Sequence, residues 1–489
     1  MPGLLGMMVM ASCAVPDAQP VRPNIILVMA DDLGYGDVGY MGNPIVHTPH
    51  LDQMASEGIQ FTRFYAASPV CSPTRASCLT GRHPYRSGIP WAGRHALPNT
   101  ETTLASVLRS EGYATGLFGK WHIGGLSRLI DQSHFPDGPT PYSPPWEHGF
   151  DVTFASESMM PLYNPYYYVG GDYGEKDYRH VQTEPVDYGQ KSGGHPWKNL
   201  YWTGPGQFVD EELSGVSDAL LMDRALAFIE EQVALDKPFF TVIWFHTPHS
   251  PIVASDAHRD MYPGLPVPAQ HWFGCVTAMD EQIGRLRSSL REWGVSDETI
   301  VWFKSDNGPS YIHDYNSAGP LRGGKAELFE GGIRVPAIME WPALFSDHKI
   351  VNEAISTSDL FPTLLSMAGI EYKSQVSLDG ENVLPVISDG VKRNKPIGFI
   401  APLPNRLRPF QSTAEEQFAF MQGDYKLLSI DGGTTFQVYD IVNDPGEQSD
   451  LSDILVDIKL SMNTTLTEWI QEVRSDFEGV RLQRQIAVP

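Results

Sequence analysis

The sequence predicts an α/β fold: a large mixed, mostly parallel sheet sandwiched by helices, plus a small C-terminal subdomain with a short antiparallel sheet and a helix. First, the continuous apolar run 24–30 and the largely apolar segment 299–304 are typical of parallel strands buried on both faces. Second, these runs alternate with amphipathic segments such as 276–293, as expected when helices cover a sheet. Third, after about residue 384 the chain changes to short strands separated by Gly-Asp and Asp-Gly-Gly turns.

Local signals place the other elements. Thr48 and Pro49 predict a helix start, because threonine can cap a helix and proline suits its first position. Residues 127–215 are rich in Gly, Pro, Tyr and Trp, and we expect long binding loops there. The remaining predicted elements are strands 113–118, 238–245, 335–339, 418–421, 426–429 and 437–439 and helices 49–57, 100–110, 218–233 and 454–477.

Length and charge limit the kind of protein. A chain of 489 residues is too long for one simple core, so we expect a main domain over residues 21–384 and a subdomain over 385–489. The net charge of -24 argues against nucleic acid as a partner over a broad surface. Past the N-terminus, no stretch approaches the ~20 apolar residues of a membrane-spanning helix, and no transmembrane segment is expected.

Residues 1–20 resemble a short export signal. They are apolar, contain many small residues and become proline-rich, and residues 10–13 (Met-Ala-Ser-Cys) resemble a lipoprotein cleavage site. The positive charge that usually begins such a signal is missing, so an unstructured tail or a wrongly assigned start codon stays open. Export would make the protein periplasmic, tethered to an outer membrane as a lipoprotein, or secreted.

The four cysteines, Cys13, Cys71, Cys78 and Cys275, are too few for a disulfide scaffold. One bridge between Cys78 and Cys275 is compatible with the sequence, which does not decide it. Cys71 opens the stretch Cys-Ser-Pro-Thr-Arg. With Ser72 as cap and Pro73 in the first position, Cys71 lies just before a helix, where the helix dipole favours an anion and Arg75 can reach back. The alternative is a capped helix with a buried cysteine.

Polar side chains follow four predicted strands, and the carboxyl ends of parallel strands meet at one edge of a sheet. Carboxylate and amide oxygens are the ligands that Ca²⁺ or Mg²⁺ prefers. Two Gly-rich basic stretches, 322–325 and 330–334, either cradle an anion or are simple turns. The strand-end residues are Asp31, Asp32, Lys120, His122, His246, His249, Asp306 and Asn307.

The motifs together resemble the type I, formylglycine-dependent sulfatases of the alkaline-phosphatase-like superfamily. Cys-Ser-Pro-Thr-Arg at 71–75 is similar to that family's maturation signature, with Ser72 in place of the commoner threonine, and Thr-Gly-Arg at 80–82 continues it. The resemblance runs from about residue 23 to 451. The other matching motifs are Asp-Asp at 31–32, Gly-Lys-Trp-His at 119–122, Pro-His at 248–249, Asp-Asn-Gly at 306–308, Lys325 with Glu-Gly-Gly at 330–332, Tyr-Asp at 439–440 and Asp-Pro-Gly-Glu at 444–447.

The resemblance implies a role for each residue. Cys71, converted by a formylglycine-generating enzyme to 3-oxoalanine (formylglycine), would act as an aldehyde hydrate. Arg75 would steady the hydrate and His122 would assist it. His249 or Lys325 would protonate the leaving oxygen, with His246 not excluded, and His246 and Arg322 are weaker candidates for substrate binding. Lys120 and Lys325 would bind sulfate oxygens. The implied ligands of Ca²⁺, with Mg²⁺ as the alternative, are Asp31, Asp32, Cys71 after modification, Asp306 and Asn307.

The aromatic loops between residues 142 and 202 favour a carbohydrate, because sugar rings stack on Trp and Tyr faces, although loops of this size also need aromatic cores of their own. We expect a sulfated oligo- or polysaccharide, such as the marine polymers carrageenan or ulvan, with a glycosaminoglycan as the next choice. Two alternatives stay open. One is a formylglycine-dependent phosphonate or phosphodiester hydrolase, and the other is a non-catalytic carbohydrate-binding relic.

Overall fold

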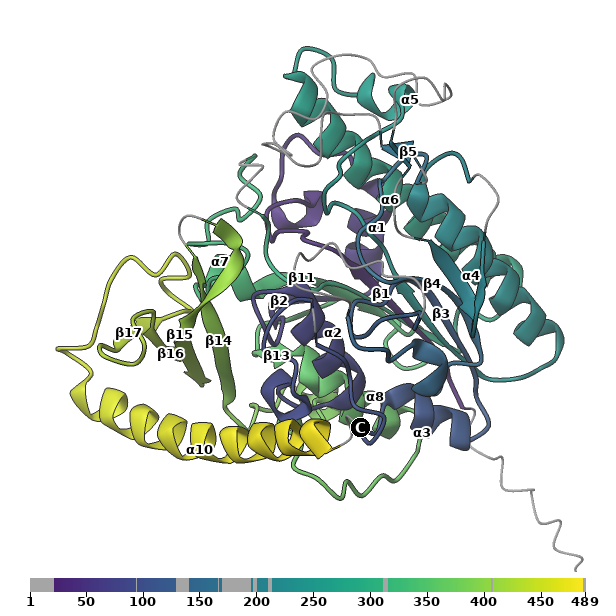
Figure 1. Cartoon of the computed structure of the whole chain (residues 1–489). Helices are drawn as coiled ribbons and strands as arrows, with labels where there is room; N and C mark the ends of the chain where they lie inside the picture. The colour runs from purple at the N-terminus through teal and green to yellow at the C-terminus, as the bar shows by residue number, and fades with distance from the viewer. Residues whose placement is uncertain are drawn as a thin grey trace, which may run out of the picture.

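The computed structural model describes residues 22–93, 95–128, 140–165, 200–209, 213–310, 315–405 and 408–486, and a short hairpin of 167–168 with 195–196. Figure 1 shows a main sheet covered by helices on both faces, with a smaller lobe formed by the C-terminal part of the chain. The predicted fold class is therefore confirmed. The predicted signal region 1–20, Cys13 and most of the predicted aromatic loops lie outside the described residues.

The main sheet is mixed, with the order β12-β2-β11-β10-β1-β9-β3-β4-β7-β8 and with β13 also paired to β2. Its centre is parallel, since β1 pairs with β10 and β9, and β3 pairs with β9 and β4. In contrast, β11 runs antiparallel to β10 and β2. The bounds are β1 Asn24–Ala30, β2 Ile59–Tyr65, β3 Ala114–Lys120, β4 Val152–Ser156, β7 Tyr201–Gly204, β8 Gln207–Phe208, β9 Phe239–Trp244, β10 Thr299–Ser305, β11 Arg334–Glu340, β12 Lys349–Val351 and β13 Ile355–Ser356. The short hairpin consists of β5 Tyr167–Tyr168 and β6 His195–Pro196.

Helices bury the two faces of this sheet in separate cores. Along β1, Ile25 and Leu27 point into one core and Ile26 and Val28 into the other, as the alternation of a strand requires. Residues of α2, α3 and α8 line the first core, and residues of α1, α4 and α6 line the second. The bounds are α1 Pro49–Glu57, α2 Cys71–Thr80, α3 Leu104–Ser110, α4 Ser217–Ala234, α5 Asp256–Arg259, α6 Val267–Glu292, α7 Glu330–Ile333, α8 Leu360–Met367 and α9 Leu384–Asp389.

The C-terminal lobe contains a four-stranded antiparallel sheet in the order β14-β15-β16-β17 and the long helix α10. In Figure 1, α10 lies across the bottom of this sheet and reaches toward the main body. The bounds are β14 Ile397–Asn405, β15 Arg408–Gln422, β16 Tyr425–Ser429, β17 Gln437–Asp440 and α10 Val456–Ile486.

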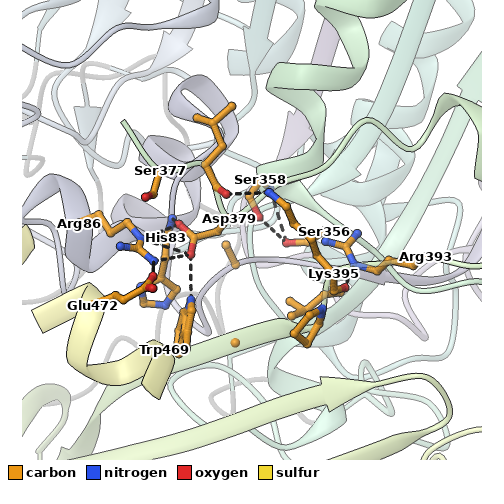
Figure 2. Close-up of a pocket in the computed structure, with 15 residues that line it drawn as sticks. His83, Arg86, Ser356, Ser358, Ser377, Asp379, Arg393, Lys395, Trp469 and Glu472 are labelled. Carbon is orange, nitrogen blue, oxygen red and sulfur yellow. Dashed lines mark hydrogen bonds and ion pairs between the residues drawn. The ribbon is translucent and has the colours of Figure 1, made fainter. Parts of the chain in front are cut away.

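Asp379 ties α10 to the main body, as Figure 2 shows. Its carboxylate accepts hydrogen bonds from Trp469 Nε1 of α10 at 2.9 Å and from the backbone N–H of His83 at 2.6 Å. Arg86 Nε donates to the same carboxylate at 2.9 Å, and Arg86 also pairs with Glu472 of α10. These residues line a cavity of about 230 Å³ between the two lobes. Because the buried arginine is paired with carboxylates, we interpret the residues around this cavity as structural contacts that hold the two lobes together.

Several boundaries differ from the sequence predictions. α2 begins at Cys71, and its N-cap is Val70, which has an extended backbone and no side-chain cap bond, so Ser72 is the second helical residue and not the cap. α3 begins at Leu104 behind a capping box of Thr103 and Ser106, later than the predicted residue 100. α6 begins at Val267, earlier than predicted, while β2 and β14 are absent from the predicted set. Boundaries of this kind depend on tertiary contacts.

The sequence did not decide whether Cys78 and Cys275 form a disulfide. In the structure both are buried free thiols. Cys78 belongs to the core on the α2 side of the sheet and Cys275 to the core on the α6 side, so the sheet lies between them. Within the described part of the chain, no helix is long and apolar enough to cross a membrane.

Candidate active site at the carboxyl edge of the sheet

The carboxyl ends of the parallel strands bring the predicted polar residues together. Asp31 follows β1, Asp306 follows β10, His246 follows β9 and Lys120 is the last residue of β3. In the sheet, β1 lies between β10 and β9, and β9 lies between β1 and β3. All four side chains are fully buried. A buried group of this polarity is stable only with partners, which the neighbouring strand ends supply.

Cys71 is the first residue of α2 and is only 2% exposed. Its Sγ lies 3.2 Å from His122 Nδ1. Burial raises the pKa of the Cys71 thiol, against the opposing charges of Lys120 and Lys325. The thiol is therefore protonated near neutral pH, whereas catalytic cysteines usually have a lowered pKa.

Arg75 lies one turn further along α2 and connects three elements. Its Nη2 is 2.7 Å from Asp306 Oδ2, and its Nη1 donates to the carbonyl of Lys120 at 2.9 Å. Its guanidinium also lies over the ring of Trp244, 5.1 Å from the ring centroid. The fully buried Arg75 side chain thus fixes the start of α2 relative to the strand ends.

The acidic residues form a pocket of oxygen ligands. One ligand atom from each of Asp31, Cys71 and Asp306 lies within 4.8 Å of the others, and the same holds for Asp31, Asp32 and His249. Burial and the neighbouring Asp31 carboxylate raise the pKa of Asp306 to about 7, despite the Arg75 ion pair. Asp32 has a positive φ of 67°, a strained conformation that is common at functional sites. Such crowding of carboxylates favours a bound cation.

Two unpartnered oxygens test whether these residues fit a cation. Among the described residues, no donor bonds to Asp31 Oδ1 or to Asn307 Oδ1, although both atoms are buried. The Asn307 amide nitrogen donates to Asp32 Oδ1 at 2.8 Å, which identifies the remaining oxygen as an acceptor. Buried acceptors without donors are costly, and hard oxygen ligands suit Ca²⁺ or Mg²⁺. The residues therefore fit a divalent cation.

Two lysines face the carboxylates. Lys120 Nζ donates to Asp31 Oδ2 at 2.6 Å, and Lys325 Nζ donates to Asp32 Oδ2 at 2.7 Å. Although burial opposes it, the Asp32 carboxylate raises the pKa of Lys325, so that this amine stays charged. A divalent cation on the carboxylates would leave both ammonium groups available to an anion.

The three histidines differ in their hydrogen bonds. His249 Nδ1 donates to the carbonyl of Ser250 at 2.7 Å, so in the neutral ring Nε2 carries the lone pair, and Nε2 lies 3.8 Å from Asp32 Oδ2. Burial lowers the pKa of His249 to about 4. His122 has a positive φ of 57°, and no described residue bonds to its buried Nε2.

His246 is held by a residue that the sequence predictions missed, Ser156 at the end of β4. Ser156 Oγ donates to the carbonyl of Ser158 at 2.9 Å and therefore accepts from His246 Nε2, 2.7 Å away. Burial lowers the pKa of His246 to about 3. The available signal was weaker than the one that identified Asp31: Ser156 follows Val-Thr-Phe-Ala at 152–155, a short run that Thr153 interrupts.

Arg322 lies elsewhere. Its side chain is exposed, its guanidinium lies 4.0 Å from the ring centroid of Phe329, and its Nη1 donates to the carbonyl of Glu447 at 3.2 Å. It therefore contacts the C-terminal lobe and is not among the residues that surround Cys71.

Comparison with known proteins identifies the family. The sulfatase family profile matches residues 23–370, most of the chain. The chain belongs to the sulfatase family. A second profile, that of the C-terminal part of N-sulphoglucosamine sulphohydrolase, matches residues 324–475. As a sulfatase the protein is a sulfuric ester hydrolase, and sulfatases generally use formylglycine and a divalent metal ion, for which the acidic residues described above are suitable ligands.

Curated sulfatases cover about three quarters of the chain. N-acetylgalactosamine-6-sulfatase of Canis lupus familiaris is 33% identical over 408 residues, which cover 78% of this chain and 69% of that protein. The corresponding protein of Sus scrofa is 34% identical over 402 residues, with the same coverage. Steryl-sulfatase of Mus musculus is 31% identical over 434 residues, covering 77% of this chain and 66% of that protein.

Solved structures share the fold over nearly the whole chain. Ps i-CgsB, in complex with k-i-k-neocarrahexaose, superposes with a TM-score of 0.75 at 25% identity, covering 92% of each chain. PsFucS1 sulfatase from Pseudoalteromonas sp. gives a TM-score of 0.72 at 25% identity, covering 93% of this chain and 91% of that one. Phosphonate monoester hydrolase of Agrobacterium radiobacter, at 20% identity, shares the fold with a TM-score of 0.63, covering 93% of this chain and 96% of that one.

Proposed function

We propose that this sulfatase removes sulfate from a sulfated carbohydrate, with Cys71 converted to formylglycine and with Ca²⁺, or Mg²⁺ as the alternative, held by Asp31, Asp32, Asp306 and Asn307. One observation carries the proposal. The Cys71 Sγ lies at the start of a buried helix, within 4.8 Å of Asp31 and Asp306 ligand atoms and 3.2 Å from His122 Nδ1. An oxygen in place of this sulfur would complete the set of hard ligands.

The state of Cys71 supports its conversion. A buried thiol with a raised pKa is a poor nucleophile, so the unmodified residue is not suited to attack an ester. Formylglycine, as its hydrate, supplies a hydroxyl nucleophile and a second hydroxyl whose deprotonation releases sulfate. Since every residue of α2 is buried, a maturation enzyme cannot reach Cys71 in the folded protein, and we infer that the conversion precedes folding.

The surrounding cations have distinct tasks. Sulfuryl transfer needs in-line attack and neutralisation of the three non-bridging sulfate oxygens. Lys120 and Lys325 would contact those oxygens, while Arg75, fixed by Asp306, would hold the modified side chain in place. His122, neutral because burial and the nearby cations Lys120 and Arg75 lower its pKa, would accept a proton from the hydrate through Nδ1.

The geometry distinguishes the candidates for the leaving-group acid. Nε2 of His246 is committed to Ser156, and Lys325, with its raised pKa, holds its proton tightly. His249 keeps Nε2 free of strong bonds while Nδ1 is fixed on Ser250. Without substrate the lowered pKa leaves Nε2 unprotonated. The anionic sulfate ester would raise that pKa, so that Nε2 takes up a proton from water and passes it to the leaving oxygen. We therefore assign His249 as the acid. We assign a structural role to His246, which is buried and bonded to Ser156.

For the substrate we propose a sulfated galactan such as carrageenan. Two kinds of relative support a galactose-type sugar: the N-acetylgalactosamine-6-sulfatases and the Ps i-CgsB complex with neocarrahexaose. The test is a desulfation screen over carrageenan, ulvan, N-acetylgalactosamine 6-sulfate and a small aryl sulfate, with matched phosphate esters in parallel. Release of sulfate from a carbohydrate supports the proposal. Reaction of the aryl ester alone, or faster reaction of the phosphate esters, refutes it.

The domain boundary and the location of the protein are also proposals. We place the boundary between the catalytic domain and the subdomain near residue 384, shortly before β14 begins at Ile397. We further propose that the protein is exported, to the periplasm, the outer membrane or the medium. Fractionation of cells that express the full chain tests this, and recovery of the uncleaved chain in the cytoplasm would contradict it.

A further inference from the structure

The turn that carries Lys325 has an unusual backbone. The carbonyl of Gly324 accepts a hydrogen bond from the N–H of Glu327 at 3.1 Å, so residues 324–327 form a β-turn with Lys325 and Ala326 at its centre. Ala326 has a φ of 77°. A turn with positive φ at its third position normally has glycine there, because a Cβ disfavours that conformation. Surrounding contacts must therefore hold this turn in place.

One side of the turn is fixed by the catalytic domain. The Lys325 N–H donates to the carbonyl of Pro309 at 2.8 Å, and the Ala326 N–H donates to the carbonyl of Pro69 at 2.8 Å. The Ala326 side chain packs with Val70, the residue before Cys71, and with Trp91. The methyl group of Ala326 thus connects the Lys325 turn to the start of α2.

The other side is fixed by Gln417, a residue of β15 in the C-terminal lobe. Its Nε2 donates to the carbonyl of Ala326 at 2.6 Å, and its Oε1 accepts from the N–H of Leu328 at 2.8 Å. Nε2 also donates to the carbonyl of Pro402 at 3.2 Å. Together these bonds fix which end of the Gln417 amide is the oxygen and which is the nitrogen. Gln417 is fully buried, so its bonds do not compete with water.

We propose that Gln417 is a positioning residue for sulfate binding: its amide holds the turn of Lys325 in the left-handed conformation that directs the Lys325 ammonium to the site. The C-terminal lobe thereby contributes to catalysis without contacting the substrate. The inference rests on the proposed role of Lys325 as a ligand of the sulfate oxygens. Gln417, which lies outside the sequence motifs of the catalytic domain, thereby contributes to the affinity for sulfate.

The test uses the matured full-length protein and the variants Gln417→Ala, Gln417→Ala with Ala326→Gly, and Gln422→Ala. Gln422 is an exposed residue at the end of the same strand and is the matched control. Inorganic sulfate is the probe, titrated by calorimetry, and kcat and KM are measured on the sulfate ester that reacts in the desulfation screen.

We expect Gln417→Ala to weaken sulfate binding and lower kcat/KM on the order of tenfold, the effect of releasing one strained residue. Adding Ala326→Gly should restore most of the loss, because glycine adopts a positive φ without the Cβ penalty. Gln422→Ala should match the wild type. A folded Gln417→Ala with unchanged sulfate affinity and kcat/KM, or a loss that Ala326→Gly does not reduce, overturns the proposal.

A Lys325→Ala variant separates this inference from the function on which it rests. If Lys325→Ala keeps normal sulfate affinity and kcat/KM, the role of Lys325 is wrong and the inference fails with it. If Lys325→Ala loses both while Gln417→Ala keeps both, Lys325 acts as proposed and only the inference about Gln417 is refuted.

Discussion

Lys426→Met tests how the two lobes are joined. Lys426 lies on β16 and is fully buried, and its Nζ contacts Glu330 Oε1 of α7 at 3.0 Å and Glu447 Oε1 at 2.9 Å. Tyr65 donates to the other oxygen of Glu330 at 2.9 Å, and the Glu330 N–H donates to Glu447 Oε2 at 2.7 Å. Methionine is one atom shorter and keeps most of the apolar stem, but it removes the positive charge between two buried carboxylates.

The expected cost follows from these contacts. Two carboxylates that touch one Nζ are roughly 6 Å apart, and at an effective dielectric constant of ~20 their repulsion is about 3 kcal/mol. Breaking a buried ion pair by removing one partner costs about 3–5 kcal/mol, which agrees with that estimate. Burial already raises the pKa of Glu447 against the opposing charge of Lys426, and the loss of that charge would raise it further. The penalty is therefore full at high pH and shrinks as the pH falls through this raised pKa toward the unfolded value near ~4.3.

Urea unfolding followed by Trp fluorescence at pH 8 and pH 5 measures both effects. We expect Lys426→Met to lose about 3–5 kcal/mol at pH 8 and clearly less at pH 5. Adding Glu447→Gln should recover part of the loss, and the exposed Lys373→Met serves as control. A loss below ~1 kcal/mol that does not depend on pH would refute the reasoning, because this is the range of surface ion pairs.

Three further predictions concern the site and the core. Chelation should abolish sulfate release and lower the thermal midpoint, because the buried carboxylates lose their counter-charge. Added Ca²⁺ should restore both. Full activity after exhaustive chelation would contradict the proposed cation. His249→Ala should slow hydrolysis of a carbohydrate sulfate far more than that of an activated aryl sulfate, whose leaving group needs no acid; equal losses on both esters would exclude His249 as the acid. Burial lowers the pKa of His148 to about 4, and its Nε2 lies 2.6 Å from Ser143 Oγ. Since the unfolded state then binds more protons, stability should fall by up to about 1.4 kcal/mol per pH unit as the pH drops from 6.5 to 4. In urea unfolding, His148→Gln should show a smaller fall over this range. Identical slopes for the two proteins would show that His148 is not the cause.

The strand ends explain why the candidate site was predictable. Asp31 directly follows a continuous apolar run, and Asp306 follows the apolar residues 300–303 after Lys304 and Ser305. Parallel strands bring their carboxyl ends to one edge of the sheet. The start of α2 was predicted less well. Ser72 is a typical capping residue, yet the extended backbone of Val70 and the contacts of Arg75 set the helix start at Cys71. Tertiary contacts overrode the local preference there.

Contacts between distant segments could not be predicted. Gln417 and Ala326 lie 91 residues apart in the chain, and Lys426 and Glu330 lie 96 apart. A glutamine or lysine within a strand of the C-terminal sheet would normally face solvent. Here Gln417 bonds to Ala326 and Leu328, and Lys426 pairs with Glu330, so the docking of this sheet on residues 326–333 buries both. Likewise, β2 includes Arg63, which interrupts its apolar run, and the strand was therefore not predicted.

The state of Cys71 tests the central claim most directly. The protein, produced together with a formylglycine-generating enzyme, is digested with trypsin, and the mass of the peptide Phe64–Arg75 is measured. We predict a mass lowered by the conversion of the Cys71 thiol to an aldehyde, in a preparation that releases sulfate from its substrate. An unmodified thiol in a fully active preparation would contradict the proposed nucleophile.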